Sequence, residues 1–182
     1  ELVEIAATGG VQEFERKLAR NDYPLLALWE MGVRRLRVPL QDWLDDRVRA
    51  RMRLLREIGH EFLVYSYGLP GDDALQLLDD VPGLVSAFEV VLARARMPAS
   101  VSGLAQLRER SAAKVYLSKL RMHEDAKYDG SKFSHFINHG FVAAEREQIL
   151  ELLDGQGLRG AIDGLAFRVP RRESPSAALQ TL

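Results

Sequence analysis

Lysine and histidine side chains are concentrated in one stretch, residues 114–139, which reads KVYLSKLRMHEDAKYDGSKFSHFINH. The chain has 25 Lys+Arg but only five lysines, and four of these lie here: Lys114, Lys119, Lys127 and Lys132. The same stretch holds three of the four histidines: His123, His135 and His139. Lysine carries a compact, adjustable ammonium charge, whereas arginine is a permanently charged planar fork, so the two are not interchangeable. We therefore expect the chemistry of the chain in this stretch.

Polar side chains also lie near the carboxyl ends of the predicted strands. They are Arg37, Tyr67, Glu89, Lys119 and Arg121, and His123 follows directly. Ligands of barrel and open α/β folds bind at these ends, so we expect these side chains to surround one pocket. Cations around one carboxylate suit a small anionic metabolite, for example a phosphorylated one. In the alternative interpretation, the charges form an internal salt-bridge network that only fills the fold.

Within this pocket we assign the catalytic roles to Lys119, Glu89 and His123, and substrate binding to Arg37, Tyr67 and Arg121. Lys119 shares one face of its predicted strand with Arg121, and a cationic neighbour favours an uncharged lysine that could form a Schiff base. The alternative is the commoner role of a single lysine at a strand end, which is to pair with an anion or a carboxylate.

The region 126–132 has two lysines and a glycine, which indicates either a lid that closes over an anion or a solvated loop. His135 and His139 are four residues apart and could share a metal on one helix face. However, the sequence has no H-E-x-x-H motif, and a glycine follows His139. We therefore predict no metal site and group Lys127, Lys132, His135 and His139 with the substrate-binding residues. No motif identifies a cofactor.

The composition is that of one globular domain. With 182 residues, of which 47% are hydrophobic and 28% charged, the chain can bury one core. A net charge of −1 argues against a dedicated nucleic-acid binder, which needs a basic face. The absence of cysteine excludes disulfides and thiolate catalysis.

The sequence also bears on location and completeness. No apolar run reaches the ~20 residues needed to cross a bilayer, and no signal peptide is visible, so we expect a cytoplasmic protein without a membrane partner. Because the chain begins at Glu1 rather than Met, and directly with strand-like residues, we expect it to be a piece of a longer protein.

Hydrophobic periodicity predicts alternating strands and helices over residues 1–170. Strands are expected at 2–5, 34–41, 61–68, 84–91, 114–122 and 162–169. Helices are expected at 11–20, 25–31, 46–58, 73–79, 102–112 and 142–153. This alternation is typical of a parallel α/β sheet, and we predict a single domain of about six βα units that forms an incomplete TIM-type barrel. Residues 171–182 are expected to be a frayed tail.

The alternative is an open doubly wound sheet, but no glycine-rich phosphate loop follows the first strand. An incomplete barrel exposes a strand edge. We therefore expect a second copy of the chain, or an upstream domain, to cover this edge.

The helix at 46–58 has the clearest pattern. Asp45 or Asp46 is expected to cap it, and its arginines are expected on a solvated face. Its predicted buried stripe consists of Val48, Met52, Leu55 and Ile58.

The rhythm of strands and helices resembles that of TIM-barrel domains over nearly the whole chain. In addition, VEIAATGG followed by EMGVRRLRVPLQDWLDD is similar to segments that follow the catalytic domain of some bacterial calcineurin-like metallophosphoesterases. The metal motifs of that family, D-x-H, G-N-H-[DE] and H-x-H, are missing from the chain. This second resemblance implies an accessory domain to which no catalytic residue transfers.

Two functions follow as hypotheses. The first is a barrel-type enzyme domain, such as a lyase, isomerase or hydrolase, that binds a small anionic metabolite at the carboxyl ends of its strands. The second is a non-catalytic accessory or dimerisation domain of a larger metal-dependent phosphohydrolase.

Overall fold

The computed structural model describes residues 2–5, 17–20, 22–121, 139–155, 157–170 and 173–181. The chain divides into two compact units, Glu1–Leu36 and Arg37–Leu182. Among the described residues, no helix has the length and apolar character needed to span a membrane.

The described residues of the first unit form a two-stranded sheet and one helix. β1 (Leu2–Ile5) pairs antiparallel with β2 (Lys17–Arg20), so that Ile5 lies opposite Lys17. The strand at 2–5 is thus confirmed, whereas the helix expected over 11–20 is wrong at 17–20, because pairing with β1 overrides the local helical spacing. α1 (Asp22–Glu30) follows, and Gly32, with a φ of 73°, provides the left-handed residue that often ends a helix.

The remaining elements alternate between strands and helical segments, as predicted, but Leu40 and Gln41, which were expected to end a strand, begin a helix instead. In chain order they are β3 (Arg35–Pro39), α2 (Leu40–Leu44), α3 (Asp46–Glu57), β4 (Glu61–Tyr67), α4 (Asp72–Asp80), β5 (Val85–Leu92), the 3-10 turns η1 (Arg94–Arg96) and η2 (Pro98–Ser100), α5 (Val101–Arg110), β6 (Lys114–Lys119), η3 (Ala143–Glu145), α6 (Arg146–Gly155), α7 (Leu158–Ala161), β7 (Gly164–Leu165) and α8 (Pro175–Thr181).

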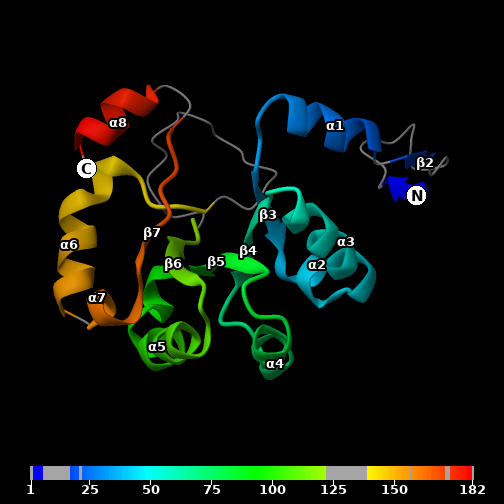
Figure 1. Ribbon diagram of the computed structural model, residues 1–182. Helices are drawn as coiled ribbons and strands as arrows, with labels where there is room; N and C mark the ends of the chain where they lie inside the picture. Colours follow the sequence, from blue (N-terminus) through cyan, green and yellow to red (C-terminus); the bar gives the residue numbers. More distant parts are fainter. Residues whose placement is uncertain are drawn as a thin grey trace. The chain divides into compact units, whose positions relative to one another are not determined.

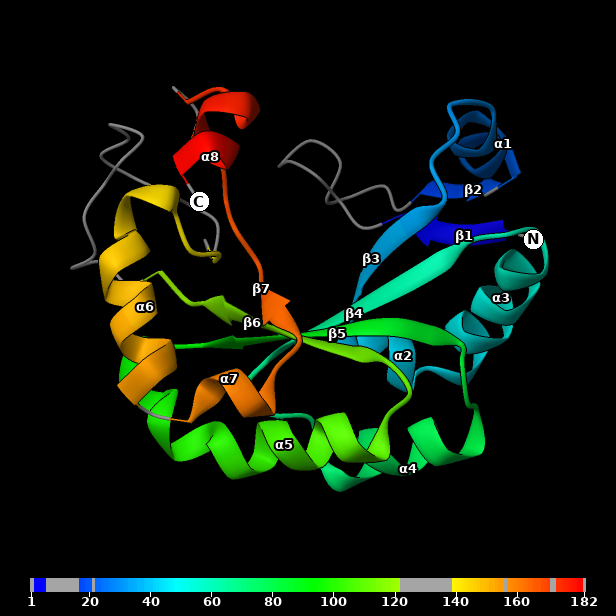
Figure 2. The same cartoon turned by 60° about the vertical axis from the view of Figure 1, so that its left-hand side comes forward.

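Strands β3 to β7 form one open parallel sheet in the order β3-β4-β5-β6-β7. Strands that are consecutive in sequence are neighbours in space, without the reversal of order found in doubly wound sheets. Because crossovers between parallel strands are right-handed, this order places the connecting helices on one face. Figure 2 shows α4, α5 and α7 along the same side of the sheet. The predicted parallel α/β sheet is confirmed, but the described strands do not close into a barrel.

The helices form a continuous layer in which α2 contacts α4, α4 contacts α5, α5 contacts α7, and α7 contacts α6 (Figure 1). Strand residues of one alternation are fully buried, which matches packing against this layer: Phe62, Val64, Phe88, Val90, Val115 and Leu117. Burying a side chain of this size contributes about 1.5–3 kcal/mol. The other alternation contains Tyr65, Glu89 and Tyr116, which pair across β4, β5 and β6.

Several local predictions need correction. Asp45 does cap α3, since its carboxylate accepts from the backbone N–H groups of Arg47 and Val48. However, Ile58 is exposed and Arg49 is buried. The guanidinium of Arg49 donates to the carbonyl of Trp43 at 2.6 Å and lies over its indole ring, so this arginine packs inward rather than on the solvated face.

The carboxyl-terminal elements also differ from expectation. β7 is only two residues long, and beyond it the chain forms a single bridge, Phe167 to Phe141. The tail expected to fray contains α8, in which Ala178 is buried.

Candidate functional site

The strand register brings polar side chains together on the sheet face opposite to the apolar core. Tyr65 pairs with Glu89, and Tyr67 pairs with Val91, which pairs with Ser118. Side chains at paired positions of a parallel sheet point to the same face, and so do residues two apart on one strand. Tyr65, Tyr67, Glu89 and Ser118 therefore share one face near the carboxyl ends of three strands.

Glu89 is the buried centre of this group, with 4% of its surface exposed. Its Oε2 accepts from Nε of Arg37 at 2.7 Å, and its Oε1 lies 3.0 Å from Nδ1 of His139. Burial by itself would raise the pKa of Glu89. Hydrogen bonds from His139, Arg37 and Ser118, together with the charge of Arg37, more than offset this effect and lower the pKa to about 2. The carboxylate is therefore ionised at neutral pH.

The imidazole of His139 contacts three polar side chains. Nη2 of Arg37 lies 3.0 Å from its Nε2 and 3.5 Å from its Nδ1, so this nitrogen is close to both ring nitrogens. Nδ1 also lies 3.0 Å from Oε1 of Glu89 and 3.3 Å from the hydroxyl oxygen of Ser118. Arg37, Glu89 and Ser118 together hold the ring in place.

Aromatic rings support the polar groups. The guanidinium carbon of Arg37 lies 3.8 Å from the ring centre of Tyr65, a close cation–π contact. His139 stacks against Tyr65 at 6.1 Å, and Tyr67 meets His139 edge-on at 5.9 Å. Tyr67 is 51% exposed, and burial of the rest of it raises the pKa of its phenol. We call Arg37, Tyr65, Tyr67, Glu89, Ser118 and His139 the Glu89 cluster.

Arg37 has unused hydrogen-bonding capacity. A guanidinium has five N–H groups, and Arg37 uses one for Glu89 and one for His139. It makes no other hydrogen bond to the residues that the structure describes, so three N–H groups remain. Its side chain is 38% exposed, so part of it is in contact with solvent.

Lys119 and Arg121 are near each other, as expected, but they surround a different carboxylate. Nζ of Lys119 lies 2.8 Å from Oε1 of Glu145, and Nη1 of Arg121 lies 3.3 Å from Oε2. All three side chains are buried. Glu145 also accepts from the backbone N–H of Val142, which precedes η3. Lys119, Arg121 and Glu145 thereby link the end of β6 to η3, which leads into α6.

Lys119 points away from the Glu89 cluster. Glu89 pairs with Tyr116 across β5 and β6, and Lys119 is three residues after Tyr116. Because side chains alternate along a strand, Lys119 faces the side of the sheet opposite to Glu89.

The structure thus brings together four of the residues assigned from sequence: Arg37, Tyr67, Glu89 and His139. It places Lys119 and Arg121 apart from them. His123, Lys127, Lys132 and His135, with the suggested lid, lie outside the described residues. The catalytic and binding roles assigned to all these residues remain predictions.

Three residues at these two clusters were not anticipated from sequence. Tyr65 and Ser118 could have been found by alternation, since Tyr65 is two residues before Tyr67, and Ser118 is one before Lys119 and so on the other face. Glu145 gives no comparable signal, because an acidic residue at the start of a helix usually serves only as a cap.

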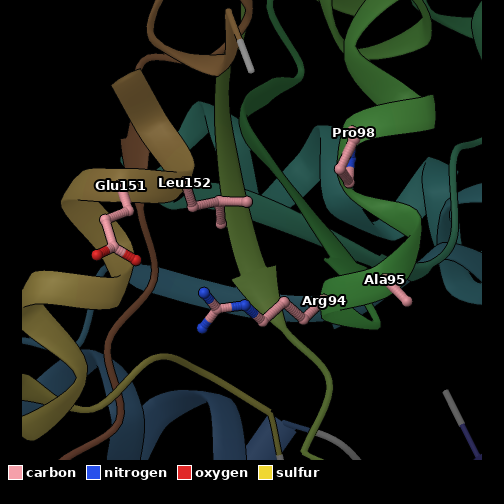
Figure 3. Close-up of a pocket in the computed structure, with 5 residues that line it drawn as sticks. All are labelled: Arg94, Ala95, Pro98, Glu151 and Leu152. Carbon is pink, nitrogen blue, oxygen red and sulfur yellow. The ribbon is translucent and has the colours of Figure 1, made fainter. Parts of the chain in front are cut away.

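No group of three or more histidine, cysteine or carboxylate residues within the described ranges is arranged to hold a metal ion. A separate hollow of about 550 Å³ is lined by Arg94, Ala95, Pro98, Glu151 and Leu152. Figure 3 shows Arg94 extending toward α6, the helix that carries Glu151 and Leu152. Its Nη1 donates to Gln148 at 2.8 Å. No member of the Glu89 cluster lines this hollow.

The chain matches no protein-family model, no curated protein and no solved structure. The resemblances to TIM barrels and to metallophosphoesterases therefore remain predictions, beyond the parallel α/β sheet itself.

Proposed function

We propose that the second unit binds a small anionic metabolite through Arg37, at the carboxyl ends of its parallel strands. The observation that carries this proposal is the state of the Arg37 guanidinium. Its Nε donates to the buried carboxylate of Glu89, the side chain is 38% exposed, and three of its N–H groups have no partner among the described residues. An anchored guanidinium with free donors suits a carboxylate or phosphate group, which it can bind through two parallel hydrogen bonds.

We further propose that the site belongs to an enzyme that uses acid–base chemistry. The carboxylate of Glu89 contacts Nδ1 of His139 at 3.0 Å and so orients the imidazole. An imidazole oriented by a carboxylate is a common general acid or base. The phenol of Tyr67, half exposed beside His139, is a second group that could donate a hydrogen bond to the ligand. A lyase, isomerase or hydrolase reaction is compatible with this set.

The sheet supports a partial-barrel form of the proposal. Its strands follow sequence order, its helices lie in one layer, and the Glu89 cluster lies on the other face, which would be the interior of a barrel. Active sites of such barrels lie at the carboxyl ends of the strands. A second copy of the chain, or a further segment, would then cover the free edges of the sheet.

The proposal is tested by measuring binding of sulfate, inorganic phosphate and a panel of phosphorylated and carboxylated metabolites to the full chain by calorimetry. We expect Arg37→Gln to weaken binding at least tenfold. Arg94→Gln provides the matched control, because Arg94 is exposed and contacts Gln148 rather than the Glu89 cluster. If no anion binds the native chain, or if both variants bind equally well, the proposed site is wrong.

A further inference from the structure

We infer that two copies of the chain associate through the two ends of the helix layer, with the basic helix α3 of each copy against the acidic helix α6 of the other. This inference rests on the partial-barrel form of the proposed function, in which a second copy covers the free edges of the sheet. It goes further by identifying the two surfaces that meet, and it makes no use of the anion site.

α3 and α6 are the helices at the two ends of the layer. The contacts between helices run from α3 to α2, α4, α5 and α7, and they end at α6. All of these helices belong to the second unit. Figures 1 and 2 both show α3 and α6 on opposite sides of the sheet. The inner helices of the layer therefore have neighbours on both sides, whereas the described layer stops at α3 and at α6.

α3 is a basic helix with an apolar residue on its exposed face. It contains five arginines but only two acidic residues. Arg47, Ala50 and Leu54 follow each other at spacings of three and four, so they share one face. All three are exposed, Leu54 to 64%, and Arg53 is exposed beside Leu54. Neither Arg47 nor Arg53 forms an ion pair with any other residue that the structure describes.

α6 has the opposite charge and a similar arrangement. Four exposed residues follow each other at spacings of three, one and three: Glu147, Leu150, Glu151 and Asp154. They share one face of the helix, with Leu150, which is 39% exposed, among the three acidic residues. Asp154 is paired with Arg159. Glu147 and Glu151 form no ion pair within the described part of the chain.

The two surfaces are therefore complementary in charge, and each has an exposed leucine. A contact between them buries the two leucines together and pairs the arginines of α3 with the glutamates of α6. An apolar centre with a polar rim is the usual composition of a protein interface. Contacts between two α3 surfaces, or between two α6 surfaces, would instead bring like charges together, which is unfavourable.

The partner of each surface is on a second copy, because α3 and α6 of one chain are at opposite ends of its layer. Two copies related by a two-fold axis form the same contact twice, since α3 of each copy meets α6 of the other. This pairing leaves neither helix surface unused, so the association stops at two chains.

Sedimentation velocity of the full chain tests this inference. At about 100 μM, a concentration at which an interface with a micromolar dissociation constant is populated, we expect the native chain to sediment as a particle of two chains. Salt shortens the Debye length from about 10 Å at 0.1 M to about 3 Å at 1 M. Because the contact depends on exposed charges, we expect the dissociation constant to rise at least about tenfold in 1 M sodium chloride.

Two double variants each reverse the charge of one surface. Arg47→Glu with Arg53→Glu makes the α3 surface acidic. Glu147→Arg with Glu151→Arg makes the α6 surface basic. Each variant alone brings like charges together in both contacts, so we expect each to be monomeric while its circular dichroism stays native.

An equal mixture of the two double variants is the decisive sample. The reversed α3 of one chain meets the reversed α6 of the other, and their unchanged surfaces also have opposite charges, so both contacts are restored. We expect the mixture to form the two-chain particle again. Glu109→Arg is the matched control, because Glu109 is exposed on the inner helix α5, and this variant should associate like the native chain.

The outcomes separate this inference from the anion site. A native chain that stays monomeric, a dimer that persists in both double variants, or variants that remain monomeric after mixing each overturn the pairing of α3 with α6. All three results leave the anion site in place. Conversely, a native dimer that binds no sulfate would refute the proposed anion site and leave the interface standing.

Discussion

Nε of Arg37 and Oε2 of Glu89 lie 2.7 Å apart although the two residues are separated by 52 positions in the sequence. The contact passes over the ring of Tyr65, so it links β3 to β5 across the strand between them. A buried carboxylate is unfavourable unless it is paired and hydrogen-bonded. Glu89 meets both conditions only when β3, β5, β6 and the segment at His139 are all in place.

The native chain is expected to lose stability as the pH falls into the acid range, and Glu89→Gln is expected to make this loss smaller. Folding lowers the pKa of Glu89 from 4.5 to about 2. The carboxylate therefore stabilises the fold fully above about pH 4.5, and this contribution is lost as the pH falls from there through 2. At pH 7 the variant should be less stable by about 2 kcal/mol, the size of a hydrogen-bonded charge interaction next to a partly exposed arginine.

Urea unfolding of both proteins, followed by tryptophan fluorescence at several pH values between 7 and 3, gives the difference in unfolding free energy. The difference should shrink as the pH is lowered through 4. A difference that stays constant over this range would show that the ionised form of Glu89 has no special role in stability.

Gly140→Ala should destabilise the fold and displace His139. Gly140 has a φ of 105°, a backbone conformation that alanine rarely adopts, and an added Cβ would lie 3.0 Å from the backbone nitrogen of Arg168. Strain and contact together should lower stability by at least about 1–3 kcal/mol. Because Gly140 adjoins His139, sulfate binding should change as well.

Gly155→Ala is the matched control for this substitution. Gly155 lies in α6 without a positive φ, and an added Cβ would meet nothing within 4 Å. Alanine is the better helix former by up to about 1 kcal/mol, so this variant should be as stable as the native chain or slightly more stable. Equal losses of thermal stability in the two variants would contradict the role given to the backbone at Gly140.

The sequence allowed the parallel α/β class and several strand-end residues to be predicted, but not how these residues are grouped. Alternation along a single strand could not show that Lys119 and Glu89 face opposite sides, because that depends on Glu89 pairing with Tyr116 rather than with a neighbour. A shift of one residue in this register would have brought Lys119 to the face of Glu89.

The sequence also did not allow the partners of the charged residues to be predicted. Lys119 pairs with Glu145, which lies 26 residues later in the next helical segment. His139 reaches Glu89 only because the chain returns to bridge with Leu120. Both contacts depend on how a long connection comes back to the sheet, and residue types alone do not encode that path.

Asp163→Ala should weaken the attachment of β7 to β6. Oδ2 of Asp163 accepts from the backbone N–H of Val115 at 2.8 Å, and Oδ1 accepts from Nε of Arg108 at 2.9 Å. Loss of the carboxylate leaves the Val115 N–H without this partner, and such losses cost about 1–2 kcal/mol. For a chain of this size, that corresponds to a fall in Tm of about 3–6 °C.

The same interaction should have a recognisable pH dependence. The hydrogen bond from Val115, followed by that from Arg108, lowers the pKa of Asp163, so its contribution is present at neutral pH and is lost in acid. The Tm difference between the native chain and Asp163→Ala, measured by differential scanning calorimetry, should therefore be smaller at pH 3 than at pH 7. The opposite trend would rule out the ionised carboxylate as the stabilising form.

Lys119→Met should reduce stability and leave anion binding intact, which distinguishes a structural lysine from the catalytic lysine expected from sequence alone. Removing the ammonium leaves the buried carboxylate of Glu145 with Arg121 and the Val142 N–H as partners. Breaking a buried ion pair typically costs about 3–5 kcal/mol, and these remaining partners place the expected loss near 3 kcal/mol. Glu145→Gln is the matched variant and should lose more in urea unfolding, because it neutralises the carboxylate that both Lys119 and Arg121 contact. Sulfate affinity of Lys119→Met should equal that of the native chain, because Lys119 faces away from Arg37 and Glu89. If a folded Lys119→Met variant no longer binds sulfate, Lys119 is part of the binding site after all.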